Sequence, residues 1–572
     1  MLNKDFFLKP THPMQKRYEA LRASYVDNLS SEEISKSFAY TVYSFKSLKR
    51  DSKDIKAEDI FKELKRGPKK PQERTISARE RIIELRKKNF SVVEIQEKLR
   101  QEGVKLSINH LSVLLRREGF TKLFRRTNRE RLEALQQDKR YPEISDRKLF
   151  AERQEVSTTF GGVFLFLPLI RQLRLDELFG ADGFRSTKAI PSISYLLSYL
   201  ALKLLGKDRV CHIDDFGFDY GLGVFAGLNI LPKSASISGY TYRHSARVIR
   251  KLLNGFIKRL HLEGYIKGRN INLDFHVIPH YGDGSVLEGH WVPTRGKRMK
   301  SVLSFFAQDL DTTFLCFSDG EIRKDAQSDE VLEFIRFYEN STGLLPERLV
   351  FDSKLTTYRN LDKLNQRGIL FITLKRRGKK FLEEISKITK WNKVTLDNVK
   401  RKYRNLRYRE KEIPLKGYEG SVREIIVQGA GRELPMCLIS NDLKNSVKEL
   451  LTTYSHRWRI ENNIQENVDF FNLNALASPV VVKVDFDIAM TLIANTLYKV
   501  LAQKTKWFKN ASPKTISRNF IDIKTNISIK GDIIKVKLGL KNYNPVIMEW
   551  VNSLEEIKIP WWENRTLVFD FD

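Results

Sequence analysis

The stretch that decides the fold is Arg269-Asn270-Ile271-Asn272-Leu273-Asp274-Phe275-His276-Val277-Ile278, in which apolar residues alternate and Asp274 lies at the centre. Such alternation is typical of a β-strand. Further strands are predicted at residues 299–308, 312–317, 348–353 and 369–374, with helices at 328–340 and 358–367. This β-β-β-α-β-α-β order predicts a mixed α/β sheet, and ligands gather at the carboxyl ends of strands in such sheets.

Two further acids stand out beside Asp274. Asp352 ends the short apolar strand predicted at 348–353, and Glu461 follows Tyr454 and Arg457 at spacings i, i+3 and i+7. A helix is predicted over residues 446–471, and on a helix these three positions share one face. Taken singly, such acids are more often helix caps, turn residues or halves of solvated charge pairs.

Acids on two strands and on a helix could gather three carboxylates around one point. Phosphodiester cleavage and transfer can be run by two divalent cations about 3.5–4 Å apart, which clamp the attacking and leaving oxygens. Mg²⁺ suits such a site because it prefers carboxylate and phosphate oxygens.

Composition favours a polyanionic partner. The 572 residues carry 101 Lys and Arg against 70 Asp and Glu, a net charge of +31. Nucleic acid is the most economical partner, with an anionic membrane surface or a ribosomal-type structural role as alternatives. We expect neither a secretory signal nor a membrane span. Cys211, Cys316 and Cys437 form no CxxC, which excludes a disulfide framework or zinc site and fits a reducing cytoplasm.

The pattern of helices in the N-terminal region predicts a tandem repeat. Helices are expected at residues 17–26, 31–38 and 41–50, and again at 77–88, 92–102 and 107–117. Leu29, Ser30 and Ile34 correspond to Phe90, Ser91 and Ile95 in one register. This plan predicts two helix-turn-helix units whose last helices read a DNA groove; a small protein-binding helical bundle is the alternative. The candidate DNA-binding residues are Thr41, Tyr43, Ser44 and Lys46 in the first unit and Ser107, Asn109 and His110 in the second.

The expected organisation is a multidomain α plus α/β protein. The predicted parts are a first helix-turn-helix unit (1–65), a basic Pro-rich linker (66–76), a second unit (77–135), a linker (136–157), a helical subdomain (158–268), the first part of the α/β domain (269–377), a β-rich insertion (378–445), a helical second part with the third acid (446–510) and a β-rich C-terminal tail (511–572). The insertion is inferred from the long interval between Asp352 and Glu461.

These residues resemble a DDE transposase of a prokaryotic insertion sequence, of the type with a β insertion before the third acid. That type carries the signature Tyr-x2-Arg-x3-Glu-x6-Lys. Tyr454, Arg457 and Glu461 match its first three positions, while Val468 stands in place of the lysine. The resemblance covers roughly residues 158–510 in layout.

The resemblance implies an RNase H-like catalytic domain in which Asp274, Asp352 and Glu461 are the catalytic triad and the ligands of two Mg²⁺ ions, with Mn²⁺ as a substitute. It implies that Tyr454 and Arg457 bind phosphates, and that Lys375, Arg376 or Arg377 replaces the missing lysine. In relatives an aromatic side chain of the insertion stacks on a flipped base; Trp391 is a candidate here, although a core or rim tryptophan is the favoured interpretation.

The implied activity is cleavage at transposon ends followed by attack of a 3′-hydroxyl on target DNA. The expected partners are double-stranded DNA, both ends and target, and a second copy of the chain in a synaptic homodimer. No membrane partner is expected, and the expected location is the prokaryotic cytoplasm, at the nucleoid. The alternatives are a sequence-specific DNA-binding regulator or inactive relative, and a metal-dependent nuclease without strand transfer. Lys297, Arg298 and Lys300 form a basic cluster that either tracks DNA or solubilises a sheet edge.

Overall fold

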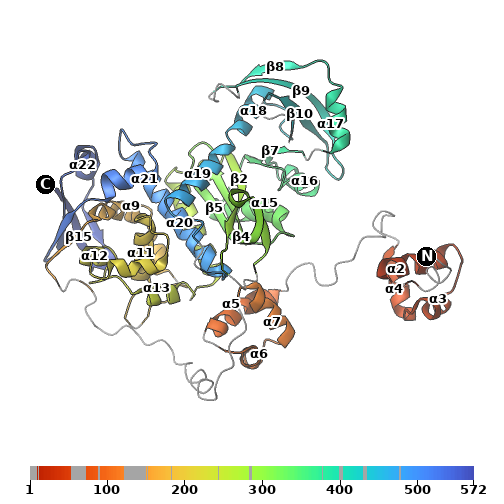
Figure 1. Cartoon of the computed structure of the whole chain (residues 1–572), viewed down its shortest axis with the longest axis horizontal. Coiled ribbons are helices and arrows are strands. Elements are labelled where there is room, and N and C mark those ends of the chain that lie inside the picture. The colour runs from red at the N-terminus through yellow and green to blue at the C-terminus, as the bar shows by residue number, and fades with distance from the viewer. Residues whose placement is uncertain are drawn as a thin grey trace. The chain divides into compact units, whose positions relative to one another are not determined.

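The computed structural model is a mixed α/β protein (Figure 1). It describes residues 10, 12–52, 73–87, 90–120, 150, 153–181, 183–187, 189–242, 244–282, 287–375, 378–397, 404–429, 435–475 and 478–572. The chain divides into two compact units, Met1–Ser77 and Ala78–Asp572. Within the described residues no helix combines the length and apolarity needed to cross a bilayer.

Among residues 12–52 of the first unit, three helices pack around a small apolar core. They are α2 (Pro13–Tyr25), α3 (Ser31–Phe38) and α4 (Val42–Ser52), close to the predicted positions. Ile34, Phe38 and Phe45 are among the buried side chains that hold them together. Ser30 and Glu33 form a capping box at the start of α3, which satisfies two N–H groups and sets where the helix begins.

A second three-helix group follows, made of α5 (Glu73–Lys87), α6 (Val92–Gln101) and α7 (Ile108–Arg117). Because α5 begins at Glu73, the predicted linker at 66–76 is wrong over its last residues, and 66–72 lie outside the described part. The group packs on the rest of the second unit. Lys87 donates to the His244 carbonyl at 3.5 Å. A Cβ on Gly119, at φ +86°, would lie 2.5 Å from the Pro479 carbonyl oxygen, so this approach requires glycine.

Residues 158–268 form mainly helices, as predicted. They comprise η2 (Gly161–Leu165), α9 (Phe166–Gln172), α10 (Leu175–Gly180), α11 (Ser192–Leu204), η3 (Val210–Phe216), α12 (Tyr220–Phe225), α13 (Ser234–Tyr240) and α14 (Ala246–Leu262). Their apolar faces belong to the same large core as the main sheet. This helical body therefore folds together with the sheet.

A five-stranded sheet joins the C-terminal segment to this helical body. Its strand order is β1 (Glu155–Thr158), β12 (Thr525–Lys530), β13 (Ile533–Leu538), β15 (Arg565–Phe571) and β14 (Ile557–Ile559). The predicted linker at 136–157 is wrong at its end, because β1 pairs with β12. Ahead of β12, the chain forms a π-helix, η7 (Ser517–Ile521). Helices α21 (Pro513–Ile516) and α22 (Asn544–Asn552) and the short η8 (Pro560–Trp562) complete the segment.

This C-terminal segment is part of the body. Trp562 is fully buried, and its indole Nε1 donates to the Val224 carbonyl at 2.8 Å. The prediction of a tail was therefore wrong in its packing, although its β content is confirmed. The alternation of apolar residues in 533–538 indicates a strand. Nothing in the local sequence indicates that this strand pairs with β15.

The main sheet contains the predicted β-β-β-α-β-α-β order. The elements are β2 (Asn270–Pro279), β3 (Gly289–Val292), η4 (Pro293–Arg295), β4 (Lys297–Asp309), β5 (Leu315–Ile322), η5 (Gln327–Asp329), α15 (Glu330–Thr342), β6 (Arg348–Phe351), α16 (Tyr358–Gln366) and β7 (Leu370–Leu374). The central strand β2 pairs antiparallel with β4 and parallel with β6, and β4 pairs with β5 on its other side. The short β3 was not predicted.

Helices cover both faces of this sheet. Phe305 and Phe317 contact each other on one face, where Phe317 also meets Phe334 and Phe337 of α15. On the other face lie α18 (Val447–Ser455), α19 (Trp458–Asp469) and α20 (Val481–Gln503). Asp485 of α20 accepts a hydrogen bond from the Gly320 amide of β5 at 3.2 Å. The second face is the one that carries Asp274, because side chains alternate along a strand.

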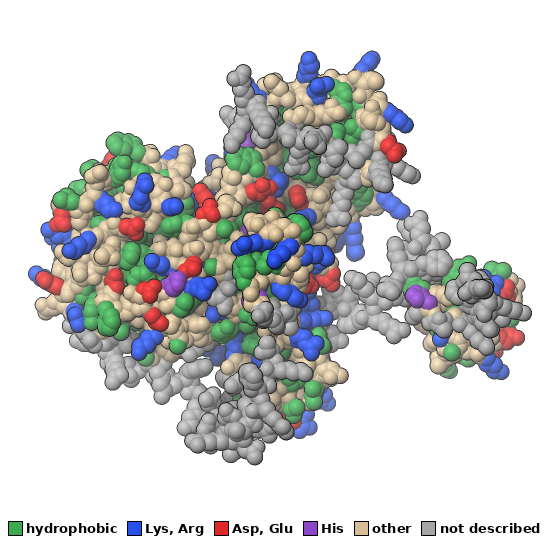
Figure 2. Space-filling view, in the orientation of Figure 1, with side chains coloured by type: hydrophobic (Ala, Val, Ile, Leu, Met, Phe, Trp, Pro, Cys, Tyr) green, Lys and Arg blue, Asp and Glu red, His purple; other side chains and the backbone are tan. Residues whose placement is uncertain are grey.

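The insertion is β-rich, as predicted, and it extends the main sheet. Its elements are α17 (Lys379–Ser386), β8 (Asn392–Thr395), β9 (Asn405–Pro414), β10 (Ser421–Gln428) and β11 (Met436–Ser440). β11 pairs antiparallel with β7, so the strand order continues β7-β11-β10-β9-β8. Figure 2 shows Lys and Arg side chains along the outer edge of the lobe formed by these strands.

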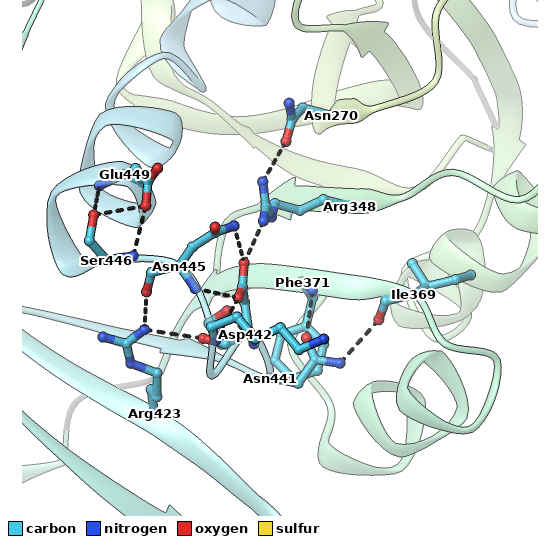
Figure 3. Close-up of polar contacts among 12 residues, drawn as sticks. Asn270, Arg348, Ile369, Phe371, Arg423, Asn441, Asp442, Asn445, Ser446 and Glu449 are labelled. Atoms are coloured by element: carbon cyan, nitrogen blue, oxygen red, sulfur yellow. Dashed lines mark hydrogen bonds and ion pairs between the residues drawn. The ribbon is translucent and has the colours of Figure 1, made fainter.

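A polar network anchors the point where the chain leaves the insertion and enters α18 (Figure 3). Asp442 is buried and pairs with Arg348 of β6, which also donates to Asn270 of β2 at 3.0 Å. The Asp442 carboxylate further accepts the backbone N–H and side-chain amide of Asn445, at 3.0 and 2.8 Å. Ser446 and Glu449 then form a capping box that starts α18. The entry of α18 is therefore bound to β6 through Arg348, which in turn is bonded to β2.

We predict that Asp442→Asn lowers the free energy of unfolding by about 3 kcal/mol at pH 7, since Arg348 would keep a buried charge without its partner. Burial raises the pKa of Asp442, but hydrogen bonds from Asn445 and Arg348 outweigh it and leave the pKa below its ordinary value. A lowered carboxyl pKa stabilises the fold above about pH 4. The gap between wild type and variant should therefore be complete above that pH and close as the pH falls further.

Urea unfolding at a series of pH values measures this gap. Asp397→Asn is the matched control, because Asp397 pairs with Lys448 at 2.8 Å on the surface, where such pairs contribute little. Equal, small effects of both substitutions would contradict the anchoring role of Asp442.

Candidate active site

Asp274 and Asp352 lie on neighbouring parallel strands. In the ladder between β2 and β6 the last pair is Leu273 with Phe351. Asp274 and Asp352 are the next residues on each strand path, and adjacent strands are about 4.8 Å apart. The two acids therefore lie side by side, Asp274 in the middle of β2 and Asp352 just after β6. Asp352 also accepts the backbone N–H of Lys354 at 2.8 Å, which fixes the turn that follows β6.

Glu461 reaches this place from the first turn of α19. The prediction of one helix over 446–471 is wrong, because a turn at His456 and Arg457 separates α18 from α19. The sheet explains the break: Asn272 of β2 and Gln308 of β4 donate to the carbonyls of His456 and Arg459, both at 3.4 Å. These two amide side chains fasten the turn to the central strands.

Arg457 joins the helix to the sheet. Its guanidinium donates to Asp274 Oδ2 at 3.2 Å and to Glu461 Oε1 at 2.5 Å. The side chains of Arg457 and Asp274 are each only 14% exposed, while that of Glu461 is 52% exposed. Charge-assisted hydrogen bonds of this kind are strong when they are buried. The i,i+4 pair of Arg457 with Glu461, which is the alternative to a catalytic role for Glu461, is thus present, and Arg457 also reaches across to the first acid.

Burial has the largest effect on the pKa of Asp274, and its charged neighbours act on that pKa in both directions. Burial raises the pKa of Asp274 to about 6; Arg457 lowers it, while Glu461 and Asp352 raise it. Both other acids therefore lie near enough to repel the Asp274 carboxylate. A cation of higher charge than one guanidinium would relieve this repulsion.

The donor set fits a hard divalent cation, but its arrangement is that of an arginine-bridged acid cluster. In the described part of the chain no group of three or more His, Cys, Asp or Glu side chains is arranged to hold a metal ion. Carboxylates are the ligands that Mg²⁺ prefers, and here Arg457 occupies the position between two of them. Glu461, half exposed, would have to turn away from Arg457 to become a third ligand.

Polar neighbours surround the cluster. His276 lies two residues after Asp274, on the same face, and its Nε2 forms a 2.7 Å hydrogen bond with Asn474 Oδ1. Burial lowers the pKa of His276. Glu466, which could compete as third acid, instead lies near Lys499, and burial raises its pKa.

Asn272 and Gln308 were not singled out in the sequence. The signal was present, however, since Asn272 lies two residues before Asp274 and therefore on the same face of the strand. Such a residue needs a hydrogen-bond partner.

The other predicted contacts near the acids are placed differently. Tyr454 is 9% exposed and packs in the apolar cluster between α18 and the extended sheet. Lys375 ends β7 and pairs with the buried Glu424 at 2.6 Å, while Arg376 and Arg377 lie outside the described residues. Val468 packs against the main core. Roles in phosphate binding for Tyr454, Lys375 and Arg376 stay predictions.

Trp391 lies on the insertion. Its indole Nε1 donates to the Ile388 carbonyl at 3.1 Å, and its half-buried ring packs against the cluster of Ile385, Ile426 and Cys437. This packing agrees with a rim tryptophan.

The predicted DNA-reading residues lie at exposed helix starts. Thr41 accepts the Ser44 amide at 3.1 Å at the start of α4, and Ser107 accepts the His110 amide at 3.2 Å at the start of α7. All seven candidates are exposed: Thr41, Tyr43, Ser44, Lys46, Ser107, Asn109 and His110. The basic runs at 65–71 and 122–131 lie outside the described residues.

Neither a scan against models of protein families nor a comparison with curated proteins finds a match to this chain.

Proposed function

We propose that this protein is a DDE-type DNA transposase that binds transposon ends, cleaves DNA strands with Mg²⁺ and transfers them to a target. The observation that carries the proposal is the meeting of Asp274, Asp352 and the Arg457–Glu461 pair on one face of the sheet. These groups come from segments far apart in sequence.

The strand order supports an RNase H-like catalytic domain. Across the sheet it reads β5-β4-β2-β6-β7, with β5, β4 and β2 antiparallel and β6 and β7 parallel to β2. The first acid lies on the central strand and the second follows the next one. The insertion between β7 and α18 agrees with the type of transposase that the signature resembles.

In this proposal Asp274, Asp352 and Glu461 hold the divalent cations, Mg²⁺ or Mn²⁺. Bound cations would polarise the scissile phosphodiester and favour a reactive water or 3′-hydroxyl. The residues of the chain do the positioning: Asn272 and Gln308 hold the turn before α19, and Arg457, released from Glu461, is placed to bind a phosphate oxygen. His276 and Asn474 brace the same face.

The three-helix groups support a role in end binding. In each group a short connection joins two helices, and the second helix presents exposed polar residues at its start, as groove-reading helices do. The proposed partners are double-stranded DNA of the ends and target and a second copy of the chain, because two ends must be brought together. The alternative is a regulator that binds DNA without cutting it. The ion pairs of Arg457 with Asp274 and Glu461 favour it, because Arg457 then occupies the position of a metal ion.

We predict that the full chain nicks DNA that carries the inverted repeats flanking its gene, in the presence of Mg²⁺. Asp274→Asn, Asp352→Asn and Glu461→Gln should each reduce nicking by about a thousandfold, because several kcal/mol of charge stabilisation in the transition state is lost. Product gels measure nicking and joined strands. Glu466→Gln is the matched control on the same helix and should stay near wild type.

Two results separate the alternatives. Equal nicking by wild type and all three acid variants would refute the assignment of the site. Nicked but never joined products would indicate a nuclease without strand transfer.

We also predict that Tyr43→Ala and Asn109→Ala each weaken binding to end DNA about tenfold or more, since one base contact is worth about 1–3 kcal/mol. Binding to scrambled DNA should hardly change, because phosphate contacts carry that affinity. Fluorescence anisotropy with both DNAs measures the ratio, and Glu97→Gln on α6 is the control. Unchanged preference for end DNA in both variants would remove these helices from end recognition.

A further inference from the structure

The β3–β4 hairpin presents aromatic and basic side chains together at the edge of the main sheet. Trp291 is 57% exposed, and Tyr281, just after β2, is 62% exposed. Trp291 lies directly opposite Arg298 in the hairpin, so the indole and the guanidinium stand on one face. Arg295 lies 5.6 Å from the centre of the Tyr281 ring and donates to its hydroxyl at 3.4 Å.

The charge of the described hairpin, residues 287–300, is strongly positive. Arg295, Lys297, Arg298 and Lys300 are exposed. Its described acid, Glu288, accepts the backbone N–H of Lys324 at 2.9 Å and lies 3.6 Å from His290 Nε2. Lysines on an edge strand often prevent it from pairing with a strand of another chain. That role does not explain why an exposed tryptophan lies among the cations. Aromatic rings interleaved with cations are typical of surfaces that bind single-stranded nucleic acid.

The hairpin and the acid cluster share strand β4. Phe306 of β4 is opposite Asp274, and Arg298 lies eight residues earlier on the same strand. An even spacing keeps Arg298 on the Asp274 face, about 26 Å away along the strand.

Other basic side chains lie near the hairpin. Burial lowers the pKa of His290, and Lys324, Arg298 and Lys354 lower it further, against Glu288. His290 and Trp291 are successive residues of β3, so their side chains point to opposite faces. The cations on the Trp291 face of the hairpin are Arg298, directly opposite it, and Lys300, two residues farther along β4.

We propose that the β3–β4 hairpin binds an unpaired DNA strand about 26 Å along β4 from the acids, with a base stacked on Trp291 and phosphates on Arg298 and Lys300. The proposal rests on the proposed function, which places the cleaved phosphate at the acids. A strand is unpaired near a cleaved or frayed end, where a base is available for stacking. An acidic protein partner would use the same cations but would gain nothing specific from the stacking face.

Anisotropy titrations of the full chain with a labelled oligothymidylate and a duplex, each of about 20 nucleotides per strand, test the proposal. Trp291→Ala should weaken oligothymidylate binding about 5- to 100-fold, the loss of one stacked base, and duplex binding far less. Trp291→Phe should restore most of the affinity. Arg298→Ala with Lys300→Ala should reduce the slope of log affinity against log salt by about 1.4 for the single strand.

Two matched controls accompany these variants. Phe218 is 88% exposed beside Asp219, and Phe218→Ala should bind like wild type. Lys535→Ala with Lys537→Ala removes two cations at the same spacing on β13 and should leave the single-strand affinity largely intact.

Unchanged oligothymidylate binding in Trp291→Ala overturns the proposal, and so does an equal loss for single strand and duplex. Failure here is separable from failure of the proposed function. Loss of nicking in the acid variants together with unchanged oligothymidylate binding by Trp291→Ala rejects the hairpin alone. If oligothymidylate binding depends on Trp291 but the wild-type protein never nicks DNA, the proposed transposase activity is rejected and the binding role of the hairpin stands.

Discussion

A single buried guanidinium holds the candidate site together. Arg457 bonds Asp274 on the central strand and Glu461 on the covering helix, with Asp352 alongside. Three carboxylates near one point repel each other when water is largely excluded, and removal of the partner from such a buried pair is strongly destabilising. The packing of α19 on the sheet therefore depends on a positive charge at this position. In the proposed enzyme, Asp274, Asp352 and Glu461 would hold a divalent cation that supplies positive charge here, and Arg457 would then be able to bind a phosphate oxygen.

The position of Arg457 is set by contacts distant from the acids. The chain leaves β7, builds β8 to β11 as an extension of the same sheet, and returns at Asp442. There the ion pair with Arg348 ties the start of α18 to β6 and, through Asn270, to β2. Farther along, Asn272 and Gln308 hold the turn between α18 and α19. The two ends of α18 are thus both bound to the strands that carry or adjoin the acids.

Much of this arrangement follows from local sequence patterns. Alternation around Asp274, the short apolar strand before Asp352 and the helical spacing of Arg457 with Glu461 each predicted an element that the structure contains. The break at His456 could not be predicted, because side chains of β2 and β4 cause it. The pairing of β1 with β12 was missed because residues 155–158 are short and mostly polar, and only their partner makes them a strand. The role of Asp442 could not be predicted either, because its partner Arg348 is distant in the sequence and only the fold brings the two together.

The central claim is that Asp274, Asp352 and Glu461 hold a divalent cation on this sheet. Anomalous scattering from crystals of the full chain grown with saturating Mn²⁺ tests it most directly. The account predicts a Mn²⁺ peak bonded to the carboxylates of Asp274 and Asp352, with Glu461 turned from Arg457 toward the ion. Mn²⁺ bound only elsewhere, with Arg457 still bridging Asp274 and Glu461, would contradict it.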